Sequence, residues 1–512
     1  MAGRASKSIL NAKVNVLFYF LSLFFSFFTR KIFLDCLGDE FVGLTGTLGS
    51  ILGYLNLAEL GLSSCICFFL YKPLQENDRE KTQEIMSLMG YLYRKIGLFV
   101  LGAGALISLS FPFVFTETEQ TSLAFVYFAF YSFMGSSLIE YFINYRQILL
   151  TADQKEYLIS IYMQTSTLLK IGLQILLAYY LKNIYLWSLT EFLFGLFACI
   201  VLNIKINREY PWLKADKSKG KALLKKYPEV LTNVKQIFVH KIKDFLLGRS
   251  DELFIFIFVS LKMVAYYSNY TMIIGKVAVL FNTALNSVSA SIGNLVAEGD
   301  KKKLLSVFWE MMSLRHFASG FLAFSILTLI DPFISIWLGP QYVIDQSILI
   351  LLVTYFYIEN TKRVIDMYNY AYGLYSDTWA AWTELTLNIS IILIAGHYLG
   401  IVGILLGKII SMSCISMLWK PYFLFSQGLK TPVLTYWKGA IPLYALTVGT
   451  VAAVNRLCTI LPFHPSENIW QWIAYSASSV IIYLLASSLI YYNFTKGTKD
   501  FATRMLNRFR NR

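Results

Sequence analysis

Residues 43–81 read GLTGTLGSILGYLNLAELGLSSCICFFLYKPLQENDREK, an apolar, glycine-rich run with a single acid, Glu59, that ends in a turn of basic and acidic residues. About 20 apolar residues are enough for a helix to cross a bilayer. A carboxylate facing lipid in the middle of such a helix would cost roughly 2.5–3.5 kcal/mol. Glu59 is therefore expected to face a polar interior, which favours a membrane pathway over a simple anchor.

The composition predicts an all-α polytopic membrane protein. Of the 512 residues, 56% are hydrophobic and only 15% are charged, whereas about 25% of the residues in a soluble domain are charged. The six cysteines are scattered without the spacing of a zinc or redox motif. The basic N-terminus leads into an apolar run without a cleavage site, which predicts a retained first span.

Hydropathy predicts about fourteen membrane-spanning helices. We place them at 13–34, 42–70, 86–115, 121–149, 156–181, 184–206, 248–273, 275–296, 304–330, 347–371, 378–397, 400–424, 433–455 and 468–493. The net charge of +14 is concentrated in alternate loops and at both ends of the chain, with acids in the opposite loops. By the positive-inside rule both termini are cytoplasmic. Because the basic residues are distributed according to membrane topology, the positive net charge does not indicate nucleic-acid binding, and no nucleic-acid partner is expected.

Four segments are expected. They are an N-terminal lobe with spans 1–6 (1–206), a basic cytoplasmic link with an amphipathic helix (207–243), a C-terminal lobe with spans 7–12 (244–430), and spans 13–14 with a basic cytoplasmic tail (431–512). The ends of spans 2 and 8 resemble each other, and an even number of spans separates them. Parallel repeats of this kind are related by an axis along the membrane normal. We therefore predict two six-helix lobes related by a pseudo-two-fold, plus two extra C-terminal helices.

From Lys221 to Lys243, lysines and apolar residues of the link alternate. This spacing predicts an amphipathic helix that lies on the inner leaflet. A solvated linker is the alternative for its first half.

Ionisable residues inside the predicted spans are the candidate functional groups, because exposure to lipid would be costly. The spacing of Asp244, Asp251 and Lys262 predicts one helical face, as does that of Glu359 and Arg363. Interfacial anchoring is the alternative for Arg30, Arg249 and Asp251, and a structural ion pair is the alternative for Glu359 and Arg363. The expected lining of a substrate cavity is Arg30, Glu59, Glu140, Arg146, Lys170, Arg249, Asp251, Lys262, Arg315, Glu359 and Arg363.

A coupling cation is expected at Glu384 and Asn388, with Asp244 as a further candidate. A carboxylate and an amide oxygen suit Na⁺, and the carboxylate alone suits a proton; intramembrane acids often serve coupling. No other cofactor and no bound metal is expected. The sequence contains no Walker motif, zinc-binding helix or nucleophile elbow, which favours a transporter over an enzyme. The predicted outer loops are short, which argues against a membrane-embedded polymerase or glycosyltransferase.

Several segments together resemble one protein family. They are LAELGL with LYKPL in residues 57–74, RSDELFIF with SNYTMI in residues 249–273, and WTELTLNISIILIAGHYLGIVGILLGKIIS followed by WKPYFLF in residues 382–425. Their order and spacing are similar to those of the bacterial polysaccharide exporters, the Wzx-type lipid-linked oligosaccharide flippases of the multidrug/oligosaccharidyl-lipid/polysaccharide flippase superfamily. Lys408 departs from the small or hydroxylated residue expected at its position in the twelfth span.

The resemblance implies a substrate and a route. Members of this family translocate undecaprenyl-pyrophosphate-linked oligosaccharides from the inner to the outer leaflet of the bacterial plasma membrane by alternating access, for capsule, O-antigen or exopolysaccharide. It implies that Arg30, Arg146, Arg249, Lys262 and Arg315 attract the pyrophosphate, that a cation or proton gradient couples transport, and that membrane lipids, a polysaccharide polymerase and a chain-length regulator are partners. A cation-coupled multidrug exporter of the same superfamily and a membrane-embedded polymerase or glycosyltransferase are the competing hypotheses.

Overall fold

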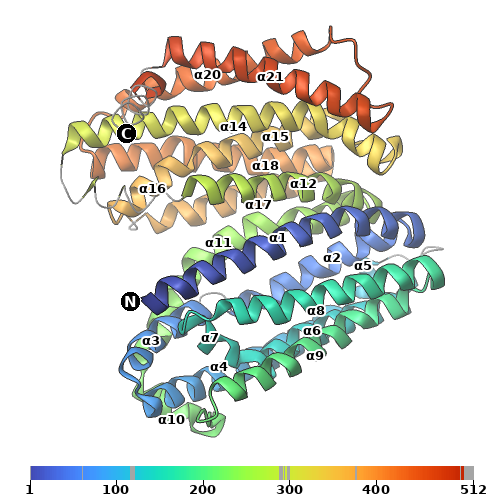
Figure 1. Cartoon of the computed structure of the whole chain (residues 1–512), viewed down its shortest axis with the longest axis vertical. Coiled ribbons are helices and arrows are strands. Elements are labelled where there is room, and N and C mark those ends of the chain that lie inside the picture. The colour runs from blue at the N-terminus through green and yellow to red at the C-terminus, as the bar shows by residue number, and fades with distance from the viewer. Residues whose placement is uncertain are drawn as a thin grey trace. The chain divides into compact units, whose positions relative to one another are not determined.

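The computed structural model describes residues 2–59, 62–115, 122–286, 292, 295–296, 300–374, 377–495 and 497–500. Throughout these ranges every regular element is a helix. The chain divides into two compact units, an N-terminal unit of Met1–Ala265 and a C-terminal unit of Tyr266–Arg512 (Figure 1).

The helices of the N-terminal unit are α1 (Ala2–Leu37), α2 (Asp39–Leu55), α3 (Leu62–Glu76), α4 (Arg79–Ser108), α5 (Phe111–Val114), α6 (Leu123–Phe142), α7 (Gln147–Ala152), α8 (Glu156–Leu176), α9 (Ile184–Glu209), α10 (Gly220–Lys226) and α11 (Pro228–Phe258). Helix α12 (Leu261–Asn286) begins in this unit and continues into the next. The C-terminal unit also contains α14 (Lys301–Trp337), α15 (Gln346–Thr361), α16 (Arg363–Ala371), α17 (Thr378–Leu399), α18 (Ile401–Met412), α19 (Lys420–Phe423), α20 (Leu434–Cys458) and α21 (Ile469–Phe494).

In the N-terminal unit, α6 packs between α4 and α9, and α8 packs against both α9 and α1. Helix α11 contacts α2 and α3. The start of α2 approaches the backbone at Leu261 so closely that a Cβ atom on Gly43 would lie 1.9 Å from the Leu261 carbonyl oxygen. Small residues permit such close approach of helices in lipid.

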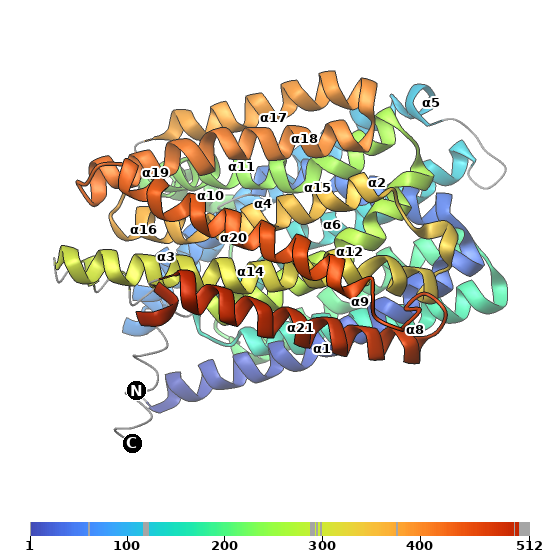
Figure 2. The same ribbon diagram turned by 90° about the horizontal axis from the view of Figure 1, so that it is seen from above.

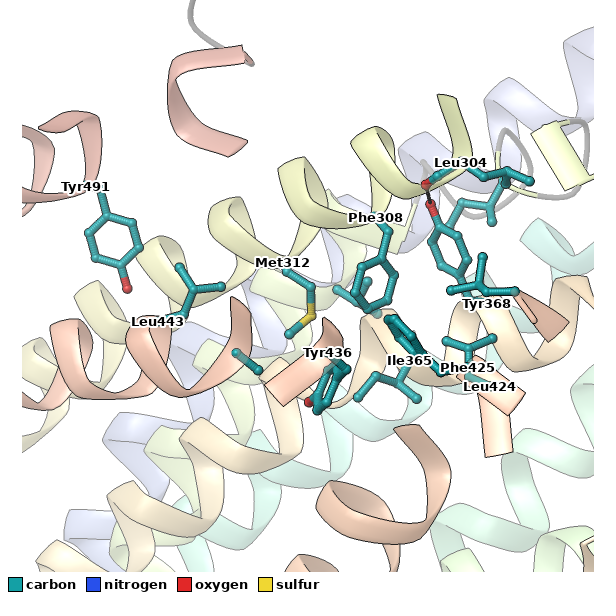
Figure 3. Close-up of a cluster of buried hydrophobic side chains, with 14 residues drawn as sticks. Leu304, Phe308, Met312, Ile365, Tyr368, Leu424, Phe425, Tyr436, Leu443 and Tyr491 are labelled. Atoms are coloured by element: carbon teal, nitrogen blue, oxygen red, sulfur yellow. Dashed lines mark hydrogen bonds between the residues drawn. The ribbon is translucent and has the colours of Figure 1, made fainter. Parts of the chain in front are cut away.

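In the C-terminal unit, α14 packs against α15, α20 and α21, and α17 runs along α18 (Figure 2). The largest described core joins α14 to α16 and α20. Figure 3 shows Phe308 and Met312 of α14 facing Ile365, Tyr368 and Tyr436, all of them buried. The Tyr368 hydroxyl donates a 3.1 Å hydrogen bond to the Leu304 carbonyl.

Nine helices in the described part of the chain are long and apolar enough to cross a membrane. They cover Lys13–Leu37, Arg79–Ser108, Leu123–Phe142, Ile184–Glu209, Lys301–Trp337, Thr378–Leu399, Ile401–Gly428, Leu434–Cys458 and Ile469–Phe494. Each overlaps one of the predicted spans. The predicted total of fourteen spans, the four-segment division and the orientation of the termini stay predictions.

The predicted boundary between the seventh and eighth spans, at residues 273–275, is wrong because α12 runs through it. The interruption lies instead at Val259 and Ser260, between α11 and α12. Asp251 and Lys262 therefore lie on different helices, and the single helical face predicted for Asp244, Asp251 and Lys262 does not form. The segment predicted as one amphipathic helix, from Lys221 to Lys243, is divided at Tyr227 between α10 and α11. Its second part continues without a break into the part of α11 that lies in the seventh predicted span.

Candidate functional site

The second predicted span is interrupted at Glu59. Helix α2 ends at Leu55, and a 3₁₀ turn follows over Asn56–Glu59. The Ser63 hydroxyl donates a 3.0 Å hydrogen bond to Glu59 Oε1, and the Tyr93 hydroxyl of α4 also donates to this oxygen. Irregular backbone at membrane depth occurs where it is buried in protein or lines a hydrated cavity, and discontinuous helices form the ligand sites of many transporters. Glu59 is thus partly buried and accepts hydrogen bonds from two hydroxyl groups, and its place in a substrate cavity stays a prediction.

The same turn is held from α6. The Tyr141 hydroxyl donates to Asn56 Oδ1 at 2.8 Å, and the Ser137 hydroxyl donates to the same oxygen at 3.1 Å. This network fixes the interruption with four hydroxyl donors from three elements, and the sequence did not indicate it.

A cavity of about 170 Å³ lies between α6, α8 and α9 and contains Glu140 and Lys170 in its lining. Lys170 Nζ lies 2.7 Å from Glu191 Oε2, and Gln174 Nε2 donates to Glu191 Oε1 at 3.0 Å. The charge of Lys170 is therefore compensated within the N-terminal unit. Glu191 was not predicted as a site residue, although an acid inside the sixth predicted span could have indicated it.

Three other predicted residues of this unit lie around α1, α2 and the interruption before α12. Arg30 Nη2 donates a 2.8 Å hydrogen bond to the Ala265 carbonyl. Lys262 Nζ lies 3.6 Å from Asp39 Oδ2 with 57% of its side chain exposed, so solvent weakens this pair. Asp251 is buried on α11. Its neighbour Glu252 accepts a 2.7 Å hydrogen bond from Ser50 of α2 and was not predicted.

Arg146 lies outside these groups, in a 3₁₀ turn after α6 (Asn144–Arg146). Its Nη1 donates a 2.9 Å hydrogen bond to Asn207 Oδ1 of α9. Asp244 and Arg249 lie on α11, but their side chains fall outside the described part of the structure.

Among the described residues of the C-terminal unit, Arg315 is the most deeply buried cation, with 2% of its surface exposed. Its Nη1 donates a 3.2 Å hydrogen bond to Asn282 Oδ1, and the Asn282 amide donates to Asn360 Oδ1 at 3.2 Å. Its guanidinium carbon lies 5.6 Å from the centroid of the Phe281 ring. The guanidinium thus connects α14 through Asn282 of α12 to α15.

Glu359 forms ion pairs with two neighbours on the same face. Its Oε2 lies 3.0 Å from Lys362 Nζ, and its Oε1 lies 3.4 Å from Arg363 Nη2. The ion pair considered for Glu359 and Arg363 is therefore present, and Lys362 is a partner that the sequence analysis missed.

Glu384 and Asn388 are both buried on α17, one helical turn apart. Asn388 is 1% exposed, and within the described structure neither its Oδ1 nor its Nδ2 has a hydrogen-bond partner. A buried amide without a partner is unfavourable, and the expected role of Glu384 and Asn388 in binding a coupling cation stays a prediction. A Cβ atom on Gly407 of α18 would lie 3.2 Å from the backbone carbonyl oxygen of Asn388, so α18 packs closely against α17 at this residue.

Lys408 follows Gly407 and is also buried, with its ammonium 4.8 Å from the centroid of the Tyr355 ring. The side chain of Lys408 thus faces Tyr355 of α15.

Helices α20 and α21 are joined to the rest of the C-terminal unit by buried hydrogen bonds. His316 Nδ1 lies 2.6 Å from the Tyr357 hydroxyl, which donates to Thr447 Oγ1 of α20 at 2.8 Å. Thr447 Oγ1 lies 2.5 Å from the Tyr491 hydroxyl of α21. His316 is fully buried at this junction.

A mainly apolar cavity of about 390 Å³ lies between α14 and α21. Leu314, Phe317, Leu489 and Tyr492 line it, and Glu310 adds a carboxylate.

The fold of this chain is similar to that of solved transport proteins. No family model matches the chain, and no curated protein matches it. The solved structure of the lipid II flippase MurJ, in an inward closed conformation, has a TM-score of 0.65 and 15% identity, and the match covers 95% of this chain and 99% of that one. An inward-facing multidrug resistance MATE family transporter of the MOP superfamily has a TM-score of 0.60 and 14% identity, over 83% of this chain and 99% of that one. The chain is therefore an all-helical, multi-pass membrane protein with the fold of these two transport proteins, as the sequence predicted.

Proposed function

We propose that the protein is a flippase that moves undecaprenyl-pyrophosphate-linked oligosaccharides from the inner to the outer leaflet of the bacterial plasma membrane for surface polysaccharide synthesis. The extent of the fold match is the main support. The lipid II flippase structure covers 95% of this chain, against 83% for the multidrug transporter. A flippase for a lipid-linked saccharide accounts for more of the chain than a drug exporter does.

The buried polar groups support an anionic substrate. A sugar-pyrophosphate head cannot cross hydrocarbon unaided, because its polar groups would lose their hydrogen bonds to water. Arg315 keeps a charged guanidinium inside the C-terminal unit, and guanidinium groups suit phosphate oxygens. Alternating access between two lobes would expose such groups to each leaflet in turn. Arg30, Arg146, Arg249 and Lys262 are further proposed contacts for the pyrophosphate.

The proposed coupling site is Glu384 with Asn388, and Asp244 is a second candidate group. Both H⁺ and Na⁺ are consistent with a buried carboxylate beside an amide. An antiporter cycle would bind the ion in one state and release it in the other.

The cavity between α14 and α21 is proposed to hold part of the polyprenyl tail, since its lining is mainly apolar. The tail of the substrate then remains beside the protein while its head crosses. Cytoplasmic termini, and contacts with a polysaccharide polymerase and a chain-length regulator, remain part of the proposal.

Ligand-dependent thermal stabilisation of the purified protein separates this function from drug export. A ligand at 100 times its Kd stabilises the native state by about 2.7 kcal/mol. Undecaprenyl-pyrophosphate-linked oligosaccharide should raise the unfolding midpoint, and cationic drugs such as ethidium should not. A shift with drugs alone would favour the multidrug exporter and contradict the proposal.

A further inference from the structure

The beginning of the link between the predicted lobes is attached along one face of α4. Gln83 Nε2 donates a 2.9 Å hydrogen bond to the Trp212 carbonyl, and the backbone N–H of Asp216 donates to Ser87 Oγ at 2.9 Å. Gly220 abuts Tyr91, where a Cβ atom would lie 2.1 Å from the tyrosine Cβ. Because residues four apart share a face of a helix, the link is fixed over about two turns of α4. It is not a solvated linker here.

This attachment positions Lys217. Its Nζ donates a 3.0 Å hydrogen bond to the carbonyl of Phe142, the last residue of α6, and lies 4.5 Å from the centroid of the Tyr145 ring. Gly90 of α4 leaves the space for both side chains. A Cβ atom on Gly90 would lie 3.1 Å from Lys217 Cγ and 2.8 Å from the Tyr145 ring.

Two arginines flank Lys217. Arg94 lies one turn after Gly90 on the same face of α4. Gly97, one turn further along this face, packs against the Phe142 side chain. Arg146 follows Tyr145 directly and is held by Asn207. Burial, followed by the positive charges of Arg146 and Arg94, lowers the pKa of Lys217. Three cations from α4, the turn after α6, and the link thus surround the end of α6.

No acid compensates these charges in the described structure. No carboxylate among the described residues forms an ion pair with Arg94, Arg146 or Lys217. The neighbouring Asp216 instead accepts hydrogen bonds from the backbone and side chain of Ser218. The partial negative charge at the carbonyl end of α6 can stabilise one cation, but it does not explain why three cations lie together. Like charges held together favour an anionic ligand, and Arg and Lys side chains are the usual partners of phosphate.

We propose that Arg94, Arg146 and Lys217 form a binding site for the phosphate group of a membrane lipid at the link end of the N-terminal unit. The site receives the pyrophosphate of the lipid-linked substrate before translocation. This identification of the ligand rests on the proposed function. The headgroup of an anionic phospholipid offers the same chemistry from a second source. In either case Lys217 connects ligand binding to the link.

The test measures lipid binding to the full chain in phosphatidylcholine nanodiscs. The probes are undecaprenyl pyrophosphate and, separately, phosphatidylglycerol. Lys217→Gln and the double variant Arg94→Gln, Lys217→Gln remove charge from the site, and Lys217→Arg keeps it. Lys219→Gln with Lys221→Gln is the matched control, since these link lysines are exposed and carry the same charge. Loss of a hydrogen bond to a charged group predicts roughly tenfold weaker binding for the site variants, with the control and Lys217→Arg within about twofold of wild type.

The two probes distinguish the sources. A loss for undecaprenyl pyrophosphate supports a substrate site, and a loss confined to phosphatidylglycerol supports a phospholipid headgroup site. Equal binding by site variants, control and wild type for both probes would overturn the proposal. A wild type that translocates lipid-linked oligosaccharide while the site variants bind normally refutes this site and leaves the function standing. If the wild type binds lipid through this site but translocates no lipid-linked oligosaccharide, the site stands and the proposed flippase function is refuted.

Discussion

Arg315 Nη1 on α14 and Asn282 Oδ1 on α12 are joined by a 3.2 Å hydrogen bond in the interior of the C-terminal unit. A neutral amide thus orients a buried guanidinium, and the same amide binds Asn360 of α15. Three helices therefore meet at one cation. An anion that approached this point would gain charge-assisted hydrogen bonds in a poorly solvated setting, where they are strongest.

Replacing Arg315 should slow translocation more than it lowers stability. Arg315→Gln removes the charge and is expected to slow flipping of a pyrophosphate-linked oligosaccharide roughly tenfold or more. Arg315→Lys should retain a larger part of the rate. The measurements are flipping rates in proteoliposomes and unfolding midpoints. A Gln variant with the wild-type rate would remove Arg315 from the substrate path.

The Lys170–Glu191 pair should be a structural element of the N-terminal unit. Its side chains are 19% and 24% exposed, so breaking it should cost less than the 3–5 kcal/mol of a fully buried pair, about 1–3 kcal/mol. Lys170→Met should lower the unfolding midpoint, and adding Glu191→Leu should restore part of it.

The control for that pair is Lys72→Met. Lys72 and Glu76 are 3.8 Å apart, with 78% and 56% of their side chains exposed, so the expected effect is within about 0.5 kcal/mol. Equal effects at Lys170 and Lys72 would show that the buried position of Lys170 has no energetic importance.

Glu384→Gln should uncouple transport from the ion gradient. The variant keeps the shape of the side chain and removes the charge that binds a cation, so flipping should lose its acceleration by an imposed gradient. Imposing Na⁺ and pH gradients separately on wild-type proteoliposomes identifies the ion. Asn388→Leu should weaken the same response, because it removes the amide that lacks a partner. A gradient response that survives in both variants would place coupling elsewhere.

Lys155, in the turn before α8, should make stability depend on alkaline pH. Burial alone would lower the pKa of Lys155, but hydrogen bonds to Asp153 and Glu209 outweigh it, and the net pKa is raised above 10.5. The charged lysine therefore stabilises the native state. That stabilisation is complete below the unfolded-state pKa and is lost as pH rises through the higher native pKa.

Unfolding midpoints of wild type and Lys155→Met between roughly pH 8 and 12 test this dependence. The advantage of the wild type should be constant up to about pH 10 and should narrow above it. An advantage that widens with alkaline pH would contradict the assigned direction.

The contact between α17 and α18 should not tolerate a side chain at Gly403. A Cβ atom there would lie 2.0 Å from the Ala395 carbonyl oxygen, and a backbone atom cannot rotate away. Gly403→Ala should destabilise the protein by roughly 1–3 kcal/mol. Gly449→Ala is the control, because its Cβ would meet nothing within 4 Å and alanine favours helix. Similar midpoints for the two variants would disprove the close contact.

Helix positions followed from local sequence, because length and hydropathy are properties of each segment alone. The predicted span at 304–330 lies within α14, whose start is fixed by Asp300 accepting hydrogen bonds from the backbone of Lys302 and Lys303. The pairing of Glu359 with Arg363 followed equally from their spacing of four residues.

Relations between distant segments could not be predicted in this way. Nothing in the sequence shows that α8 and α9 place Lys170 beside Glu191, or that Ser50 lies near Glu252. The interruption at Val259 and Ser260 was missed because neither proline nor glycine marks it, so the hydropathy continues smoothly through the break. The attachment of the link to α4 includes one hydrogen bond that Gln83 donates and one that Ser87 accepts, and such bonds leave no hydrophobic pattern in the sequence.

Protein-dependent flipping of a labelled undecaprenyl-pyrophosphate-linked oligosaccharide in proteoliposomes tests the proposed function most directly. The label is accessible to a membrane-impermeant reagent only in the outer leaflet, so its time course reports translocation. We predict rapid translocation with the wild type, slower translocation with Arg315→Gln, and none beyond background in liposomes without protein. Equal, slow translocation in all three samples would contradict a flippase function for this chain.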